Sequence, residues 1–152
     1  MTNKELIDLA ASVVKTHRIK DFLCGDVGSA VLSRSGKVYL GVCADLGCNG
    51  FCAEQNALGS MMTDGEYRFV KIVAVWKDEK GIVHVLSPCG HCRQMMMDMD
   101  KDNLKSEVIL DRDKTVTLEE LLPHHTWWKK QSDCIEPAPA DGLLRDKVKM
   151  TE

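Results

Sequence analysis

Two cysteines in the middle of the chain have the spacing of metal ligands. Cys89 and Cys92 belong to the stretch Ser87-Pro88-Cys89-Gly90-His91-Cys92-Arg93-Gln94, and C-x-x-C is the spacing with which two thiolates bind one metal ion. If a helix begins near Cys89, the two sulfurs lie three residues apart on one face. Pro88 suits a sharp turn from a strand into that helix. The pair therefore predicts part of a metal site at the start of a helix.

A third thiolate and a carboxylate lie upstream, in Cys52-Ala53-Glu54. Cys52 would complete a set of three protein ligands from a second helix start. Tetrahedral zinc with three protein ligands keeps its fourth position open, which is the arrangement of catalytic sites and not of structural ones. Glu54, two residues after Cys52, is a carboxylate that can handle protons at this open position. These residues together predict a catalytic zinc site.

Each of these residues also has a simpler interpretation. The cysteines could form a closed structural zinc site or remain buried free thiols, because cysteine is one of the residues most often buried. Glu54 by itself could be an ordinary surface carboxylate. His91 is interpreted as facing solvent or as lying beside the ligands, since three thiolates already complete the protein's share. The combination of Cys52, Glu54 and Pro88 with the C-x-x-C pair favours the catalytic interpretation.

The combined pattern resembles that of a known enzyme family. C-A-E at 52–54 and P-C-G-H-C-R-Q at 88–94 are similar to the motifs of the zinc-dependent cytidine deaminases, which include the blasticidin-S deaminases. In the family, cysteine at the place of Cys52 is typical of enzymes for free nucleosides, whereas nucleic-acid-editing relatives have histidine there. The resemblance covers residues 1–131. It includes Val27-Gly28-Ser29-Ala30, the hairpin through Gly36, Gly41-Val42 and Glu120-Leu121-Leu122-Pro123.

The resemblance implies a mechanism. One Zn²⁺ per chain, held by the three thiolates, lowers the pKa of a bound water so that hydroxide is available near neutral pH. The hydroxide attacks the amino-bearing carbon of the ring. Glu54 takes the proton of the water, delivers it to the neighbouring ring nitrogen, and passes a proton to the leaving ammonia.

Arg93 follows the last predicted ligand. The resemblance implies that it helps to neutralise the thiolates through a charge-assisted hydrogen bond. A surface ion pair is the simpler role for this residue. Many nucleoside-specific relatives also have arginine directly after the glutamate, whereas this chain has Gln55. Arg93, the helix ends or His91 must then supply part of the charge compensation.

The resemblance also indicates residues that contact the substrate: Ala53, Ser87, Cys43, Asp45 and Trp128. Cys43-Ala44-Asp45 stands where cytidine deaminases have Asn-x-Glu to hold the ribose hydroxyls, and Asp45 can still accept a hydrogen bond from a hydroxyl. Trp128 lies where relatives place an aromatic residue that closes the pocket, often from another subunit. Packing at a subunit interface is the other role open to Trp127-Trp128.

The implied activity is that of a hydrolase acting on a cyclic amidine C–N bond. Its expected reaction converts cytidine or deoxycytidine to uridine or deoxyuridine plus ammonia. Blasticidin S is the alternative substrate, because the segment from Gly41 to Cys52 has the short length associated with blasticidin-S deaminases. A non-catalytic, zinc-stabilised oligomer is an alternative of another class. The family resemblance also implies a homotetramer or, less often, a dimer.

The elements that position these residues can be read from the hydrophobic pattern. Helices are predicted over residues 3–17, 52–62 and 89–98, with a short one after the Thr117–Glu120 capping box. Five strands are predicted, over 26–33, 37–44, 69–76, 82–86 and 107–110. Alternation of strands and helices indicates an α/β fold with a mixed sheet covered by helices on both faces. The resemblance implies that this fold is a cytidine-deaminase-like three-layer α-β-α sandwich with a mixed five-stranded sheet. The two metal-binding helices are expected side by side on one face.

Composition limits the remaining possibilities. The 152 residues suggest one domain, and 44% hydrophobic residues are enough for a core. The net charge of -3, with interspersed signs, argues against a nucleic-acid partner. No stretch has the length of a membrane helix. Seven cysteines, three of them with metal spacing, favour a reducing cytoplasm over a disulfide framework. Residues 1–131 are predicted to form the catalytic domain and 132–152 a C-terminal tail or interface arm.

Overall fold

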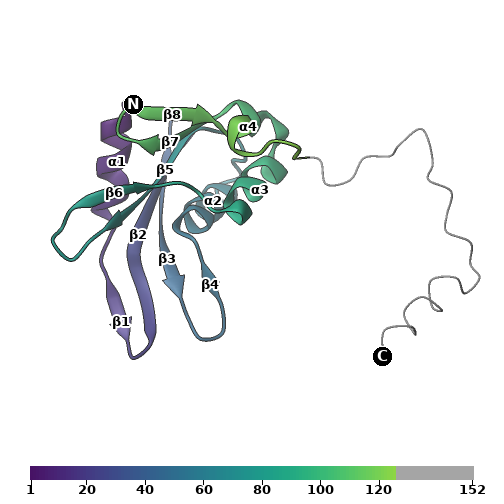
Figure 1. Cartoon of the computed structure of the whole chain (residues 1–152). Coiled ribbons are helices and arrows are strands. Elements are labelled where there is room, and N and C mark those ends of the chain that lie inside the picture. Colours follow the sequence, from purple (N-terminus) through teal and green to yellow (C-terminus); the bar gives the residue numbers. More distant parts are fainter. Residues whose placement is uncertain (126–152) are drawn as a thin grey trace, which may run out of the picture.

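The computed structural model describes residues 1–125, whose helices and strands form three layers. A β-sheet lies between α1 (Asn3–Ser12) on one side and α2 (Ala53–Thr63) and α3 (Gly90–Met99) on the other (Figure 1). The predicted α-β-α sandwich is therefore confirmed. Within residues 1–125, none of the helices has the length and hydropathy needed to cross a membrane.

The sheet has eight strands, so the prediction of five strands is wrong. The strands are β1 His17–Ile19, β2 Phe22–Ser33, β3 Val38–Asp45, β4 Gly50–Phe51, β5 Phe69–Lys77, β6 Val83–Leu86, β7 Glu107–Asp111 and β8 Lys114–Thr117. Six of them follow the order β4-β3-β2-β5-β7-β8, while β1 pairs with β2 and β6 with β5. The sheet is mixed, because β5 and β7 pair in parallel and the other described pairs are antiparallel.

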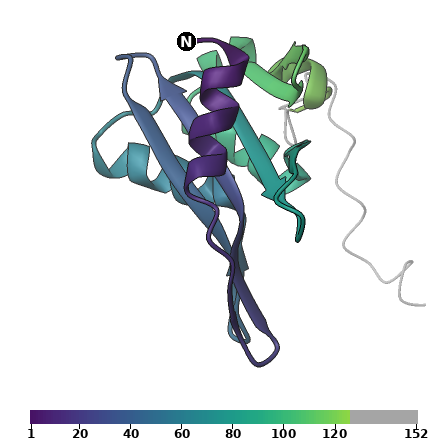
Figure 2. The same cartoon turned by 90° about the vertical axis from the view of Figure 1, so that its left-hand side faces the viewer.

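The three additional strands are short. β1, β4 and β8 have three, two and four residues, which is too few for an alternating pattern to be distinguished from a loop. Each of them forms a hairpin with a neighbouring strand, β2, β3 or β7, that was predicted from the sequence. The β1–β2 and β3–β4 hairpins project from the body of the molecule in the same direction, as Figure 1 and Figure 2 both show.

α1 covers one face of the sheet (Figure 2). Leu6, Ile7 and Ala10 are buried at helical spacing, and they pack on residues of β2 and β5. A Cβ on Gly28 would lie 2.2 Å from the carbonyl oxygen of Ala10, so only glycine allows this close approach of helix and strand. α1 ends at Ser12 and not at residue 17 as predicted, because the chain soon turns into β1.

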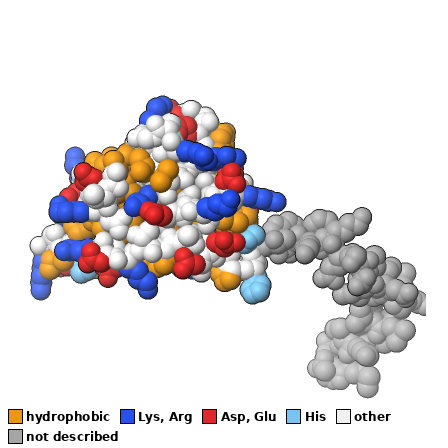
Figure 3. All heavy atoms as spheres, turned by 90° about the horizontal axis from the view of Figure 1, so that it is seen from above, with side chains coloured by type: hydrophobic (Ala, Val, Ile, Leu, Met, Phe, Trp, Pro, Cys, Tyr) orange, Lys and Arg blue, Asp and Glu red, His pale blue; other side chains and the backbone are white. Residues whose placement is uncertain are grey.

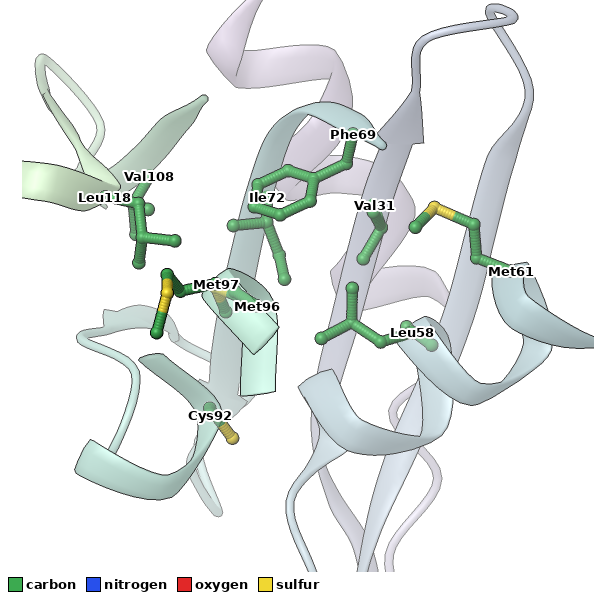
Figure 4. Packing of buried hydrophobic residues seen from close by; sticks show 11 residues of the cluster. Val31, Leu58, Met61, Phe69, Ile72, Cys92, Met96, Met97, Val108 and Leu118 are labelled. Atoms are coloured by element: carbon green, nitrogen blue, oxygen red, sulfur yellow. The ribbon is translucent and has the colours of Figure 1, made fainter. Parts of the chain in front are cut away.

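The opposite face carries the larger core (Figure 4). Side chains of α2, α3 and the sheet meet there, with the 3₁₀ helix η1 (Lys101–Lys105) and α4 (Leu118–Leu121) at the margin. Its buried members are Val31, Ala57, Leu58, Met61, Phe69, Ile72, Cys92, Met96, Met97, Val108 and Leu118. Cys92 lies at one edge of this cluster, so the predicted metal centre is continuous with the core.

The backbone of α2 contacts the sheet at Gly41 on β3. A Cβ at this position would lie 2.3 Å from the amide nitrogen of Ala57 and 2.5 Å from the carbonyl oxygen of Ala53. No side chain larger than hydrogen fits between them without displacing backbone atoms. The first turn of α2, which carries Glu54, is therefore held directly against β3.

The surface carries charges of both signs. On the face seen from above, basic and acidic side chains are interspersed and do not form a basic stripe (Figure 3). At the end of the described chain, Thr117 and Glu120 form the predicted capping box at the start of α4. The predicted residues Trp127 and Trp128, the boundary at residue 131 and the tail 132–152 lie outside the described residues.

Candidate active site

Two of the predicted ligands occupy equivalent places at the starts of α2 and α3. Cys52 is the N-cap of α2 and Cys89 is the N-cap of α3. Their sulfurs lie 3.6 Å apart, which confirms that the two helices lie side by side with their N-termini together. The sulfur of Cys89 also accepts a hydrogen bond from the backbone N–H of Cys92. A cysteine therefore takes the place of the usual capping hydroxyl or carboxylate.

Cys92 completes the group from the first turn of α3. The ligand atoms of Cys52, Cys89 and Cys92 all lie within 4.8 Å of one another. Two sulfurs bound to tetrahedral zinc at about 2.3 Å are about 3.8 Å apart, close to the 3.6 Å between Cys52 and Cys89. Cys92 is fully buried, whereas Cys89 is exposed. One of the three sulfur ligands is therefore buried in the core and another reaches the protein surface, which suits an ion bound where the core meets solvent.

The electrostatics of the three thiols fit a bound cation. Burial and the neighbouring sulfur of Cys89 raise the pKa of Cys52 to about 11. Burial and the charge of Glu54 raise the pKa of Cys92 still further. For Cys89, burial acts against ionisation, but hydrogen bonds from the backbone N–H of Cys92 and from neighbouring thiols hold the pKa below its ordinary value. Three thiolates next to Glu54 would repel one another, and a divalent cation removes that repulsion.

Glu54 is a buried carboxylate beside the sulfurs. It is 5% exposed, and burial raises its pKa. Ala74, Leu86 and Pro88 are among the residues that surround it in a small, mainly apolar recess. Its charge acts on the thiols of both Cys52 and Cys92, so it lies within electrostatic reach of the proposed ion. These surroundings exclude the interpretation of Glu54 as an ordinary surface carboxylate.

Gln55 and His91 contact each other between the starts of α2 and α3. This contact was not predicted from the sequence. The backbone N–H of Cys52 donates to Oε1 of Gln55 at 2.8 Å, and Nε2 of Gln55 lies 3.2 Å from Nε2 of His91. Gln55 thereby links the N-cap of α2 to the first turn of α3. The capping-box spacing of three residues is the sequence signal that could have indicated the first of these contacts.

Arg93 has different partners from those implied by the resemblance. Its Nε donates to the carbonyl oxygen of Pro88 at 2.9 Å, one terminal nitrogen donates to the carbonyl oxygen of Leu121 at 3.0 Å, and the other donates to Oγ of Ser87 at 3.0 Å. None of these acceptors is a sulfur or a carboxylate. In the structure Arg93 therefore holds the turn before α3 against α4, and the expected hydrogen bond to a thiolate is not formed.

The structure places only some of the residues predicted to contact the substrate close to the proposed metal ligands. Ala53 is buried in the first turn of α2, next to Glu54. Ser87 is exposed in the turn between β6 and α3, where it accepts a hydrogen bond from Arg93. Both lie next to the proposed ligands in the chain, so their backbone groups lie close to the proposed metal site.

Cys43 and Asp45, near the end of β3, differ in their surroundings. Cys43 is half-buried and its thiol donates to Oδ1 of Asp26 on β2 at 3.0 Å. Asp45 is exposed, and its backbone pairs with Leu23 and Gly50. Asp26 was not predicted as a site residue, because the irregular strand pairing that brings it to Cys43 has no signal in the sequence.

Comparison with known proteins identifies relatives of the chain. Residues 1–106 match the family model described as the cytidine and deoxycytidylate deaminase zinc-binding region. A blasticidin-S deaminase from Bacillus cereus is 33% identical over 103 residues, which are 64% of this chain and 74% of that protein. A cytidine deaminase from Shewanella woodyi is 29% identical over 123 residues, which are 78% of this chain. The chain spans only 36% of the length of the Shewanella enzyme.

A solved structure supports the same relationship. The crystal structure of a cytidine deaminase from Burkholderia pseudomallei aligns with a TM-score of 0.65 and 28% sequence identity. The alignment covers 82% of this chain and 98% of that one. The three-layer architecture, and not only the two short motifs, is therefore shared.

Proposed function

The chain belongs to the family of zinc-dependent cytidine and deoxycytidylate deaminases, and we propose that it deaminates a small cytosine nucleoside, cytidine or deoxycytidine. The products are uridine or deoxyuridine and ammonia. The observation that carries this proposal is the convergence of Cys52, Cys89 and Cys92 within 4.8 Å, with the buried carboxylate of Glu54 beside them.

The residues present fit one zinc ion per chain. Cys52, Cys89 and Cys92 would hold it, and the bound ion would supply a water of lowered pKa and charge stabilisation at the reacting carbon. Glu54 accepts a proton from water and transfers it to the ring nitrogen next to the amino-bearing carbon. The water oxygen bonds to that carbon, and Glu54 takes the remaining proton of the new hydroxyl group and donates it to the amino group, whose C–N bond breaks to release ammonia. The apolar recess around Glu54 keeps its pKa raised, which suits a group that must both accept and release protons near neutral pH.

The proposal extends to the organisation of the chain. Residues 1–131 act as the catalytic domain and 132–152 as a tail or interface arm. Copies of the chain assemble as a homotetramer or dimer, with Trp128 at the pocket of a neighbouring copy. The described cysteines are free thiols, which supports a cytoplasmic location. The nucleoside is the partner, and neither nucleic acid nor a membrane is one.

Blasticidin S is the second candidate substrate. The 33% identity to the Bacillus cereus blasticidin-S deaminase favours it, as does the short segment between Gly41 and Cys52. Incubation of the zinc-loaded protein with cytidine, deoxycytidine and blasticidin S, followed by the ultraviolet change of the ring, separates the candidates. Turnover of cytidine or deoxycytidine is expected, and turnover of blasticidin S alone would replace the first proposal by the second.

Glu54→Gln tests the proton carrier and the class of function together. The variant keeps the size of the side chain and removes its basicity, so turnover is expected to fall by at least about a hundredfold. Zinc content, measured by atomic emission, is expected to remain at about one ion per chain. Glu79→Gln, in the exposed turn between β5 and β6, is the matched control. An unchanged rate in Glu54→Gln would refute Glu54 as the proton carrier, whereas zinc binding without turnover by the wild-type protein would favour a non-catalytic zinc-stabilised oligomer.

A further inference from the structure

Cys43 lies on the face of β3 that supports α2. Gly41 contacts the backbone of the first turn of α2, and side chains two residues apart on a strand point to the same face. Cys43 is two residues closer than Gly41 to the end of β3, which continues through β4 to Cys52. Its side chain therefore borders the start of α2, where the sulfurs and Glu54 are located.

An irregularity in β2 places a carboxylate against Cys43. Cys24 pairs with Ala44 and Gly28 pairs with Val42, so the three residues 25–27 stand opposite the single residue Cys43. The backbone of Gly25 has a φ of +74°, which glycine adopts without strain. The extra length of β2 brings Oδ1 of Asp26 within 3.0 Å of the Cys43 sulfur.

The carboxylate of Asp26 retains hydrogen-bonding capacity. Its Oδ1 accepts the thiol of Cys43, whereas a carboxylate has about four acceptor positions on its two oxygens. No lysine, arginine or histidine among residues 1–125 forms an ion pair with it. Asp26 is half-buried, so its negative charge is screened less than that of a fully exposed group. It can accept a hydroxyl hydrogen and will repel a phosphate.

We infer that Asp26 is a specificity-determining residue, which accepts a hydrogen bond from a sugar hydroxyl of a nucleoside and disfavours the corresponding 5′-phosphate. Cys43 is a positioning residue that orients the carboxylate through its thiol. The inference rests on the proposed function, and the sugar is located by the resemblance of Cys43-Ala44-Asp45 to the segment that holds the ribose hydroxyls in cytidine deaminases. It explains how the chain can hold a nucleoside although Cys43 replaces the expected amide side chain.

The decisive measurement is the ratio of kcat/KM for cytidine to that for cytidine 5′-monophosphate. Asp26→Asn keeps the shape of the side chain but removes its charge. It is expected to lower this ratio about tenfold, mainly by lowering kcat/KM for cytidine, because hydrogen bonds to charged groups discriminate by about this factor or more. Cys43→Ala is expected to lower the ratio about threefold, because a neutral hydrogen bond contributes less.

Asp21→Asn is the matched control. Asp21 is exposed at the turn of the same β1–β2 hairpin, and its replacement removes the same charge, so the ratio is expected to stay within about twofold. A folded, zinc-containing Asp26→Asn variant with an unchanged ratio would overturn the inference. If Asp26→Asn does not fold, an unchanged ratio in Cys43→Ala would have the same meaning.

Calorimetry separates failure of the inference from failure of the proposed function. Cytidine and cytidine 5′-monophosphate are each titrated into the zinc-loaded wild-type protein and into the zinc-loaded Asp26→Asn variant. If no cytosine compound is turned over but cytidine binds and Asp26→Asn weakens that binding about tenfold, the proposed activity is wrong and the role of Asp26 stands. Absence of nucleoside binding by the wild-type protein would overturn both.

Discussion

The candidate active site has two parts, the sulfur end and the bulge end, which are built in different ways. The sulfur end consists of Cys52, Cys89 and Cys92, with Glu54 beside them, and it lies on the first turns of two helices. The bulge end consists of Asp26, Cys43 and Asp45 and lies where β2 and β3 lose regular register. The sulfur end is held by helix geometry and a continuous core, whereas the bulge end depends on one irregular strand pairing and a thiol–carboxylate hydrogen bond.

This difference separates chemistry from selectivity. Helix starts fix the positions of capping residues within narrow limits, so the three sulfurs cannot move independently without unwinding a turn. An irregularity in a strand pair re-aims individual side chains without changing the rest of the sheet, and such irregularities are common next to active sites. We therefore expect substitutions at the sulfur end to abolish metal binding or turnover, and substitutions at the bulge end to change which substrate is preferred.

The largest effect is expected for Cys92→Ala. This change removes the buried ligand, so zinc content should fall to background. A ligand that binds only the native state at a thousandfold excess over its Kd stabilises it by about 4 kcal/mol, and Cys92→Ala should lose that stabilisation. Urea unfolding with and without a strong zinc chelator measures the loss.

Cys48→Ala is the matched control for this prediction. Cys48 is an exposed free cysteine in the loop between β3 and β4, so its variant should keep zinc and should still lose stability when the chelator is added. Retention of one zinc per chain by Cys92→Ala would show that helix geometry does not fix the metal centre.

The contrast between the two ends also explains what could be predicted from the sequence. The C-x-x-C spacing and the C-A-E motif lie within single helical turns, so local spacing was enough to bring Cys89 to Cys92 and Glu54 to Cys52. The position of Asp26 depends on a slip in pairing between two strands, which no local pattern encodes. The partners of Arg93 were missed for a related reason, because one of them, Leu121, is distant in sequence.

Arg93→Ala should be the next largest change, and it tests whether Arg93 has a structural or an electrostatic role. Loss of its hydrogen bonds to Pro88, Leu121 and Ser87 is expected to lower the free energy of unfolding by about 2 kcal/mol. Arg93→Lys keeps the charge but not the planar fork. If the contacts matter, the lysine variant remains destabilised while its zinc affinity stays near that of the wild type. Full recovery of stability by lysine would assign the role to charge.

Gln55→Ala should have a smaller effect that is confined to the sulfur end. Residues that orient metal ligands typically change metal affinity by about tenfold or more when they are replaced, and Gln55 accepts from the backbone of Cys52 while reaching His91. The Kd for zinc, measured by competition with a chromogenic chelator, should therefore rise about tenfold. His91→Ala removes only the link to α3 and should show part of this change. Equal zinc affinity in all three proteins would show that core packing alone holds the helix starts together.

The smallest effect is expected for Asp45→Asn, at the margin of the bulge end. Asp45 is exposed, and its backbone pairs with the backbones of Leu23 and Gly50 in the sheet. Its charge is therefore screened by water, and kcat/KM for cytidine should fall by less than about threefold. Asp26→Asn, measured in parallel, should cause the larger loss because its carboxylate is half-buried and oriented by Cys43. If Asp45→Asn instead reduced kcat/KM more than Asp26→Asn does, Asp45 would hold the sugar as the family resemblance implies, and β3 rather than the irregular part of β2 would determine selectivity.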